Sequence, residues 1–454
     1  MSESRAGRLR ALAAPAALVG LVLVTRLPRL GRPRALVFDE VYYALDAADL
    51  LRHGVESSPA HPPLAKWLIA AGIRVFGFTP VGWRSAAVVA GVALVLVTWL
   101  AARKVTDHGG LAFLAGALVA LDGIAFVTGR LALLDVFVAV ATTGAAWCVL
   151  GALVDRADPE RLRRWRWAVA VLLGLGTAMK WGAVWTWPVA AVVLVSLERR
   201  AAVPGAPRRR VTVAALAVLA LVPVGVYLAS YGPWFAQAER TRAGLAHCGD
   251  ESPCRLGFTE RFVVFVDHQR MLVDFHAGLD TDNPEAAPAW SWATQSHPAN
   301  LFSKPCLPEM VDSPTSLDDG VCTDADEHTE ARLLALANPV SWFAGLLALG
   351  VLAVLAVRRG DDAAGALLAL AAAQWLPWML TGREVYSYYA VSLVPLLALA
   401  TVLALDRLPR LRRGAVPALA VGALVAFVFL YPLLTGQALT DGSADLRLFL
   451  PGGS

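Results

Sequence analysis

The chain has 454 residues, of which 57% are hydrophobic and only 17% are charged. Soluble globular chains carry about 25% charged residues, and a soluble chain could not bury this much apolar surface. A disordered chain would not carry it. The composition therefore predicts an all-α polytopic membrane protein. The net charge is +4 and only 4 of the 40 basic residues are Lys, so each Lys marks a position where a compact ammonium group is preferred to Arg.

Eleven apolar stretches are long enough to cross the roughly 30 Å hydrocarbon core of a bilayer as helices. They cover about residues 11–27, 80–101, 109–128, 131–153, 167–180, 182–197, 211–230, 339–357, 363–380, 385–405 and 414–434. The first could also be a signal peptide, but no small-residue cleavage site follows it, which favours an uncleaved helix.

Two long polar segments interrupt the apolar series, at about 28–79 and 231–338. We therefore expect an N-terminal membrane part over 1–230, which includes the first polar segment, and a C-terminal membrane part over 339–454. In the second polar segment, apolar residues recur at helical spacing over 259–272. This pattern predicts an amphipathic helix, lying either on the membrane surface or packed in a small outer domain.

The distribution of basic residues predicts the orientation. With the N-terminus inside, the six inner segments hold 21 of the 40 basic residues, whereas the short outer turns near Arg130, Lys180 and Arg383 hold one each. The segment 231–338 has 17 acidic against 7 basic residues. We therefore expect a multi-pass plasma-membrane protein whose two large loops and functional site face the extracytoplasmic side.

Four of the five cysteines lie in the segment 231–338, which this topology places in an oxidising compartment. Four cysteines allow three pairings. Cys248 with Cys254 and Cys306 with Cys322 are favoured, because both pairs close short loops. A zinc site with a nearby histidine is the alternative, although neither spacing matches a known zinc pattern.

Two adjacent carboxylates, Asp39 and Glu40, begin the first outer segment and precede Tyr42 and Tyr43. Neighbouring carboxylates repel each other, which tends to raise one pKa, and a positioned carboxylate can act as a general base. A helix N-cap at Asp39, with Glu40 in the first turn, is the structural alternative. The two roles are compatible.

Basic residues on the outer side run against the positive-inside tendency. Arg130 and Lys180 each lie in a short outer turn, and Lys66 follows the pair Pro62–Pro63. At the level of the lipid headgroups, the anion that such residues would bind is a lipid phosphate. The alternative is that each side chain extends to ordinary headgroups without a specific ligand.

Several motifs occur in a characteristic order. They are Phe38-Asp39-Glu40 with Tyr42-Tyr43, His61-Pro62-Pro63-Leu64 with Lys66-Trp67, Gly82-Trp83-Arg84, Gly129-Arg130 with Asp135, Lys180-Trp181-Gly182, Phe275-His276 with Gly278-Leu279, Gln374 to Trp378, and Arg383 with Tyr386 and Tyr389. Together they resemble the bacterial, actinobacterial-type protein O-mannosyltransferases that use a polyprenyl-phosphate sugar donor. The resemblance spans roughly residues 35–400.

The resemblance implies a C-type glycosyltransferase fold and inverting transfer of mannose from polyprenyl-phosphate-mannose to Ser or Thr hydroxyls of exported proteins. In the family pattern, Asp39 matches the catalytic carboxylate and Glu40 its neighbour, while Arg130 and Lys180 match positions around the donor. The acceptors could be presented by the secretion machinery. The acidic four-cysteine segment fits no family pattern, and it bears on acceptor choice more than on chemistry.

We therefore expect Asp39 to be the general base, assisted by Glu40. The donor phosphate would be held by Arg130, Lys180, Lys66 and Arg383, which stabilise the charge developing in the transition state. Further substrate contacts are expected from His61, Tyr43, Asp135, Trp181, Tyr386 and Tyr389, although Tyr43 and Trp181 would also suit an interfacial aromatic belt.

No Asp-x-Asp motif suggests a site for a metal-bound nucleotide sugar, so we expect neither a metal nor a further cofactor, and no nucleic-acid partner. Two alternatives remain. A related lipid-donor transferase could modify a glycolipid or a cell-wall glycan. A transporter would also have many apolar helices, but it should show internal repeats and acidic residues at the membrane midplane, whereas here the charged residues cluster at the outer face.

Overall fold

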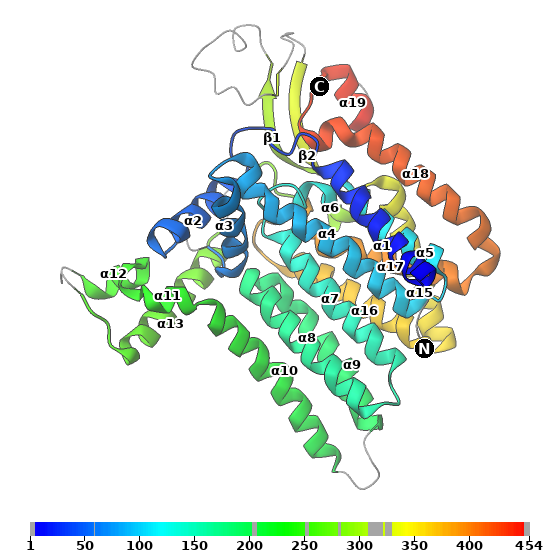
Figure 1. Cartoon of the computed structure of the whole chain (residues 1–454), viewed down its shortest axis with the longest axis horizontal. Coiled ribbons are helices and arrows are strands. Elements are labelled where there is room, and N and C mark those ends of the chain that lie inside the picture. The colour runs from blue at the N-terminus through cyan, green and yellow to red at the C-terminus, as the bar shows by residue number, and fades with distance from the viewer. Residues whose placement is uncertain are drawn as a thin grey trace.

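The computed structural model describes residues 5–58, 60–201, 207–249, 254–279, 283–306, 321–322 and 329–448. Long helices make up most of this part of the chain, and shorter helices and a small sheet gather toward one side (Figure 1). The long helices are α1 (Arg5–Arg26), α4 (Pro80–Val105), α5 (Gly109–Ala120), α7 (Asp135–Val154), α8 (Pro159–Met179), α9 (Thr186–Ala201), α10 (Arg208–Ser230), α15 (Pro339–Arg359), α16 (Asp362–Leu380), α17 (Val394–Arg407) and α18 (Pro409–Thr435).

Eight helical segments of the described chain are long and apolar enough to cross a membrane. Six are single helices, α4, α7, α10, α15, α16 and α18, and in the other two a 3-10 turn, η1 (Trp181–Trp185) or η4 (Ser387–Ser392), leads into α9 or α17. The sequence predicted eleven crossings. The other three stretches correspond to α1 and α5, whose apolar parts are shorter, and to α8, which carries five charged residues among its first eight.

The stretch expected as one crossing over 109–128 is interrupted. The carboxylate of Asp122 begins α6 (Gly123–Thr128) by accepting a hydrogen bond from the amide of Ala125 at 3.0 Å, and it also accepts one from the amide of Asn338 at 3.1 Å. At Gly123 an added Cβ would lie 2.1 Å from the carbonyl oxygen of Leu336. The backbone around Leu336 therefore packs closely against Gly123, and the helix expected over 109–128 is broken at this point.

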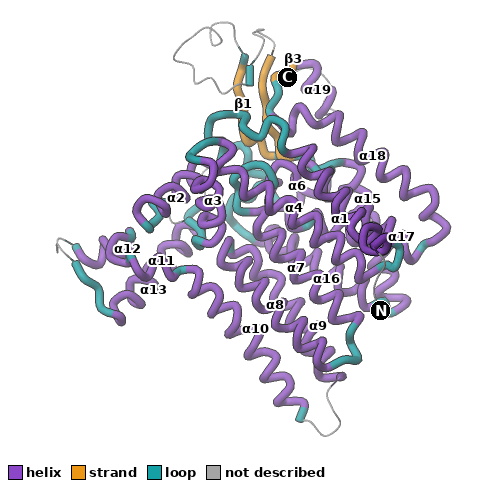
Figure 2. Tube along the Cα trace, in the orientation of Figure 1, coloured by secondary structure: helices purple, strands orange, loops and turns teal. Residues whose placement is uncertain are grey.

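The protein is mostly helical rather than all-α, because two strands of the second outer segment and one strand after α18 form a small sheet (Figure 2). Strand β1 (Ala299–Pro305) pairs antiparallel with β2 (Thr329–Ala335), and β2 pairs antiparallel with β3 (Ala438–Thr440). Helix α19 (Asp441–Leu448) follows β3. The strands depend on partners far apart in the sequence, so local apolar periodicity did not reveal them.

Shorter elements lie around the site, to which η4 and the loops between helices also contribute residues. The shorter elements are α2 (Glu40–His53), α3 (Leu64–Phe76), α11 (Gly232–Ala236), η2 (Ala238–Arg240), α12 (Arg242–Cys248), α13 (Phe258–Ala277) and η3 (Ala289–Ala293). Helix α13 confirms the amphipathic helix predicted over 259–272. Its buried face, with Phe265 and His268, packs against Tyr231 and Trp234 in a small outer cluster, while Phe258 on another face is 79% exposed.

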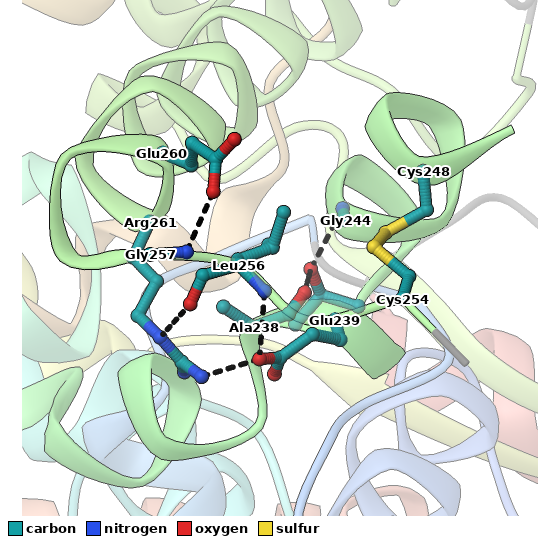
Figure 3. The surroundings of a disulfide bond; sticks show 10 residues. Ala238, Glu239, Gly244, Cys248, Cys254, Leu256, Gly257, Glu260 and Arg261 are labelled. Carbon is teal, nitrogen blue, oxygen red and sulfur yellow. Dashed lines mark hydrogen bonds and ion pairs between the residues drawn. A yellow bond between two sulfur atoms is a disulfide. The ribbon is translucent and has the colours of Figure 1, made fainter. Parts of the chain in front are cut away.

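Cys248 forms a disulfide with Cys254, and Cys306 forms one with Cys322, the pairing favoured by the sequence. Figure 3 shows the first bond and the segment after it. There the carboxylate of Glu239 accepts hydrogen bonds from the guanidinium of Arg261 and from the amide of Leu256. These contacts tie the segment after the disulfide to the first turns of α13.

The membrane helices before and after the second outer segment share one apolar core. Helix α17, which is buried along its length, packs against α4 and α5 as well as against α15 and α18. Helix α7 packs against α4, α8 and α16. The two membrane parts therefore form one body, on which the loops carrying the site are held together.

Candidate active site

A cavity of about 580 Å³ opens beside the first residues of α2. Its wall also includes residues of the first outer segment, the last turns of α13, the turn over 383–389, and Arg242 and Asn283. Six residues predicted from the sequence line it: Asp39, Tyr43, His61, Arg383, Tyr386 and Tyr389. Three separate segments of the chain thus bring these six side chains together.

Asp39 precedes α2, but its side chain does not cap the helix. Its Oδ2 atom instead accepts hydrogen bonds from the hydroxyls of Tyr43 at 3.2 Å and Tyr388 at 3.0 Å. Burial raises the pKa of Asp39, and the positive charge of Lys180 opposes this shift. The arrangement suits a general base, because a carboxylate with a raised pKa accepts a proton more readily than one exposed to water.

Tyr388 is a site residue that the sequence did not single out. Its ring is fully buried, and its hydroxyl donates to Asp39. The Tyr-rich turn 386–389 was a signal, but spacing alone pointed to Tyr386 and Tyr389. In η4, Tyr388 is the tyrosine of this turn that reaches the carboxylate.

Lys180 and Asp135 form a buried ion pair beside the cavity. The Nζ atom of Lys180 lies 2.8 and 3.0 Å from the two carboxylate oxygens of Asp135, and 4.1 Å from the centre of the Tyr389 ring. Lys180 ends α8 in an extended conformation, which turns the chain toward η1. The next residue, Trp181, donates a hydrogen bond from its indole to Tyr227 at 3.2 Å, so Trp181 links this turn to α10.

Arg383 lines the cavity, and two neutral side chains accept hydrogen bonds from it. Its guanidinium donates to Nδ1 of His276 at 2.8 Å and to the hydroxyl of Tyr389 at 3.0 Å. The His276 ring lies 4.8 Å from the ring of His61. Burial lowers the pKa of His61 well below its ordinary value and that of His276 to about 4, with further lowering of both by nearby cations. Both imidazoles are therefore neutral at ordinary pH.

Glu40 does not line the cavity. Its carboxylate accepts two hydrogen bonds from the guanidinium of Arg84, at 2.9 and 2.8 Å, and one each from the amides of Ala132, at 2.9 Å, and Val37, at 3.2 Å. Arg84 also donates to the carbonyls of nearby residues of the first outer segment. Both side chains are fully buried. Glu40 therefore anchors the loop that carries Asp39 rather than meeting a substrate.

Lys66 also lies away from the cavity. Its ammonium group contacts Asp46 at 2.9 Å, Glu56 at 2.7 Å and the carbonyl of Ser58 at 3.3 Å. Burial alone would lower the pKa of Lys66, but the two carboxylates raise it above its ordinary value. With two acidic partners and no exposed surface, Lys66 is committed to holding the segment that leads to His61.

Arg130 is fully buried behind the cavity. It donates to the carbonyls of Arg29 at 2.6 Å and Leu434 at 3.4 Å, and its guanidinium lies 5.3 Å from the centre of the Phe126 ring. The structure therefore does not bring Arg130 to the cavity with Arg383. The sequence could not show this, because the carbonyls that bind Arg130 come from opposite ends of the chain.

Among the described residues, no group of three or more His, Cys, Asp or Glu side chains is arranged to hold a metal ion. The metal-free reaction expected from the sequence stays a prediction. The polar groups that line the cavity include two carboxylates, two guanidiniums, two imidazoles and several phenols. They suit proton transfer and anion binding.

Comparison with known proteins places the chain in a family. Residues 16–237 match the family model described as dolichyl-phosphate-mannose-protein mannosyltransferase. Full-length similarity extends to a polyprenol-phosphate-mannose–protein mannosyltransferase of Mycolicibacterium smegmatis, 30% identical over 98% of this chain and 93% of that protein. The chain belongs to this mannosyltransferase family. Proteins of the same description from Mycobacterium tuberculosis (30% identical, 98% of this chain and 92% of the relative) and Corynebacterium glutamicum (27%, 94% and 91%) are similar over nearly their whole lengths.

Solved structures show the same fold. The S. cerevisiae protein O-mannosyltransferase Pmt1-Pmt2 complex, solved bound to the sugar donor, matches with a TM-score of 0.80 at 12% identity, covering 100% of this chain and 93% of that chain. ArnT from Cupriavidus metallidurans, solved bound to undecaprenyl phosphate, matches with a TM-score of 0.59 at 16% identity, covering 93% and 76%. At these identities the likeness concerns the fold. It confirms the C-type glycosyltransferase architecture expected from the sequence.

Proposed function

We propose that this mannosyltransferase transfers mannose from polyprenol-phosphate-mannose to Ser or Thr hydroxyls of exported proteins, with inversion at the anomeric carbon. The observation that carries the proposal is the environment of Asp39. Its half-buried carboxylate lines a cavity of about 580 Å³, and within the described part of the chain it accepts its hydrogen bonds from the hydroxyls of Tyr43 and Tyr388. The names of the full-length relatives support the donor and the protein acceptor.

In the proposed reaction, Asp39 accepts the proton of the acceptor hydroxyl as its oxygen attacks C1 of the mannose. The new C1–O bond forms on the face opposite the phosphate, and the electron pair of the breaking bond leaves with the phosphate oxygen. The leaving phosphate needs no proton, because it is stable as an anion. A single displacement of this kind inverts the anomeric carbon.

Arg383 is the proposed main contact of the donor phosphate. Its guanidinium is held by a neutral imidazole and a phenol, so neither of these partners offsets its charge. A guanidinium can bind two phosphate oxygens at once. Lys180 lies nearby, but Asp135 neutralises much of its charge. We assign Lys180 to the electrostatics of Asp39 and Arg383 to direct phosphate binding.

We propose that the cavity faces the extracytoplasmic side of the plasma membrane. Both disulfides lie in the second outer segment, and disulfides persist in oxidising compartments. Single cysteines replacing Trp290 in η3 and Arg163 in α8, which are both exposed, test the orientation. An impermeant thiol reagent should label position 290 but not position 163 in intact cells. The reverse pattern would contradict this topology.

The activity itself is tested with membranes that contain the protein, radiolabelled polyprenyl-phosphate-mannose and a Ser/Thr-rich peptide. We expect label in the peptide, an anomeric configuration opposite to that of the donor, and no loss of transfer in the presence of a chelator. Label recovered only in a glycolipid or a glycan would contradict the protein acceptor. Retention of configuration would contradict the single displacement by Asp39.

A further inference from the structure

His276 joins three parts of the cavity wall at the end of α13. Its Nε2 atom lies 2.7 Å from the carbonyl oxygen of Ala60 in the first outer segment. Its Nδ1 atom lies 2.8 Å from a terminal nitrogen of Arg383, in the turn before η4. The ring of His61 lies 4.8 Å away at a tilt of 31°, so the imidazole has defined neighbours at both its nitrogen atoms and beside its ring.

These two contacts determine the tautomer. A guanidinium only donates hydrogen bonds, so Nδ1 of His276 must accept and carry no proton. A carbonyl oxygen only accepts, so the proton must lie on Nε2. Both bonds exist together only in the neutral Nε2–H form, and a protonated ring would meet Arg383 with a second donor.

We propose that His276 is a positioning residue that holds the Arg383 guanidinium in the cavity and acts as the neutral Nε2–H tautomer. This inference rests on the proposed function, in which Arg383 binds the donor phosphate. The Nδ1 lone pair aligns one terminal nitrogen of Arg383, and the hydroxyl of Tyr389 receives the other at 3.0 Å. The two neutral acceptors fix the guanidinium without cancelling its charge, so it can still attract an anion.

The groups around His276 favour the neutral ring. Arg383 contacts it, Lys180 acts on it from the turn after α8, and the neutral His61 ring lies against it. Trp181 approaches at 5.9 Å between ring centres, and Phe275 on the same helix approaches at 5.3 Å. Both charged groups named here are cations, so each opposes protonation. The hydrogen bond to the carbonyl of Ala60 favours protonation of His276, whereas burial of the ring opposes protonation.

Two substitutions of similar size separate the two bonds of His276. In His276→Asn the amide oxygen can take the place of Nδ1 and accept from Arg383, but the side chain is too short to reach Ala60. In His276→Gln the amide nitrogen can take the place of Nε2 and donate to Ala60, but no acceptor remains at Nδ1. Positioning of Arg383 therefore requires His276→Asn to retain function and His276→Gln to lose it.

The measurement is the donor KM and kcat of the full-length protein in membranes, with a fixed acceptor peptide. We expect His276→Ala and His276→Gln to raise the donor KM about tenfold with a smaller change in kcat, and His276→Asn to stay within about threefold of the unchanged protein. In a double-mutant cycle, adding His276→Ala to Arg383→Ala should cause no further loss, because the residue to be positioned is already gone.

Three results would overturn the inference. Rescue by His276→Gln and not by His276→Asn would assign His276 to tethering the segment at Ala60. Fully additive losses in the double-mutant cycle would show that His276 and Arg383 act independently. An unchanged donor KM in Arg383→Ala, with inverting transfer to the peptide intact, would remove the phosphate role of Arg383 and this inference with it. Failure of the proposed function itself would instead appear as absence of transfer to the peptide by the unchanged protein.

Discussion

The charged groups behind the cavity and those lining it have different partners. Behind it, Glu40 meets Arg84 and Lys66 meets two carboxylates, so these two charges are balanced by opposite ones, although the guanidinium of Arg130 has carbonyl partners. At the cavity, Asp39 is bonded by two phenols, and Arg383 donates to an imidazole and a phenol. We call the first group the frame and the second the cavity wall.

This difference separates structural charges from reactive ones. A buried ion pair with full hydrogen bonding has no free hydrogen-bonding group for a ligand. Removing one partner leaves the other charge buried and unpaired. A charge whose hydrogen-bond partners are neutral is not offset by them, so it can act on a ligand that enters the cavity. Asp39 and Glu40 are adjacent in sequence and chemically alike, so the comparison can be tested on neighbouring residues.

Asp39→Asn should have the largest effect. The amide keeps the shape and can still bond to Tyr43 or Tyr388, but it cannot accept the proton of the acceptor. We expect kcat to fall by about 10²- to 10⁴-fold with the donor KM and the thermal midpoint nearly unchanged. Assays of Asp39→Asn at matched expression would measure this. Near-normal transfer would place Asp39 with the frame.

Glu40→Ala should disrupt the frame instead. It leaves the Arg84 guanidinium buried without its carboxylate, which typically costs about 3–5 kcal/mol. We expect poor expression and a lowered thermal midpoint in detergent, with activity falling in proportion to folded protein. The matched control is the double variant Glu40→Met with Arg84→Met, which removes both charges and should be less destabilised than Glu40→Ala. If Glu40→Ala folded normally but lost turnover per folded molecule, Glu40 would belong to the cavity wall.

Lys180→Met should change the pH dependence of turnover. Burial raises the pKa of Asp39 and the charge of Lys180 opposes that rise, so loss of the ammonium should raise this pKa further. A general base must be unprotonated, and activity is lost as pH falls through its pKa. The acid limb of the kcat profile should therefore move to higher pH. An unchanged limb would show that Lys180 does not act on the base.

Much of the fold was readable from the sequence, and the departures have local causes. Apolar runs predicted the helices because a membrane-spanning segment must satisfy its backbone hydrogen bonds internally. The break at Asp122 depends on Asn338, and the strand β2 depends on a partner at 438–440. Both contacts join residues more than a hundred positions apart, which no local pattern encodes.

The site was predictable in its residue types but not in its division into frame and cavity wall. Lys66, Arg130 and Lys180 all looked alike as isolated cations on the outer side. Their roles depend on partners that only folding supplies, such as Glu56 for Lys66 and the carbonyl of Leu434 for Arg130. For Asp39, the helix-cap alternative requires a side-chain hydrogen bond to the first turn of α2, which the structure does not contain, and its role as general base stays a prediction.

Loss of a disulfide should have the smallest effect on turnover. Cys306 and Cys322 join at a sequence separation of 16, and Cys248 and Cys254 at a separation of 6. None of the four lines the cavity. By the entropy of loop closure, a bond that closes the longer loop contributes about 3 kcal/mol and one that closes the shorter loop about 2.4 kcal/mol.

Replacing both members of either pair by Ser should therefore lower the thermal midpoint, more for Cys306 with Cys322 than for Cys248 with Cys254. Turnover per folded molecule should stay within about twofold, because the frame around Glu40 and Lys66 holds the cavity wall independently of these loops. Thermal unfolding and kcat measured on the same preparations separate the two effects. A large loss of kcat in Cys306→Ser/Cys322→Ser, without loss of folded protein, would mean that the acidic outer segment helps to shape the cavity.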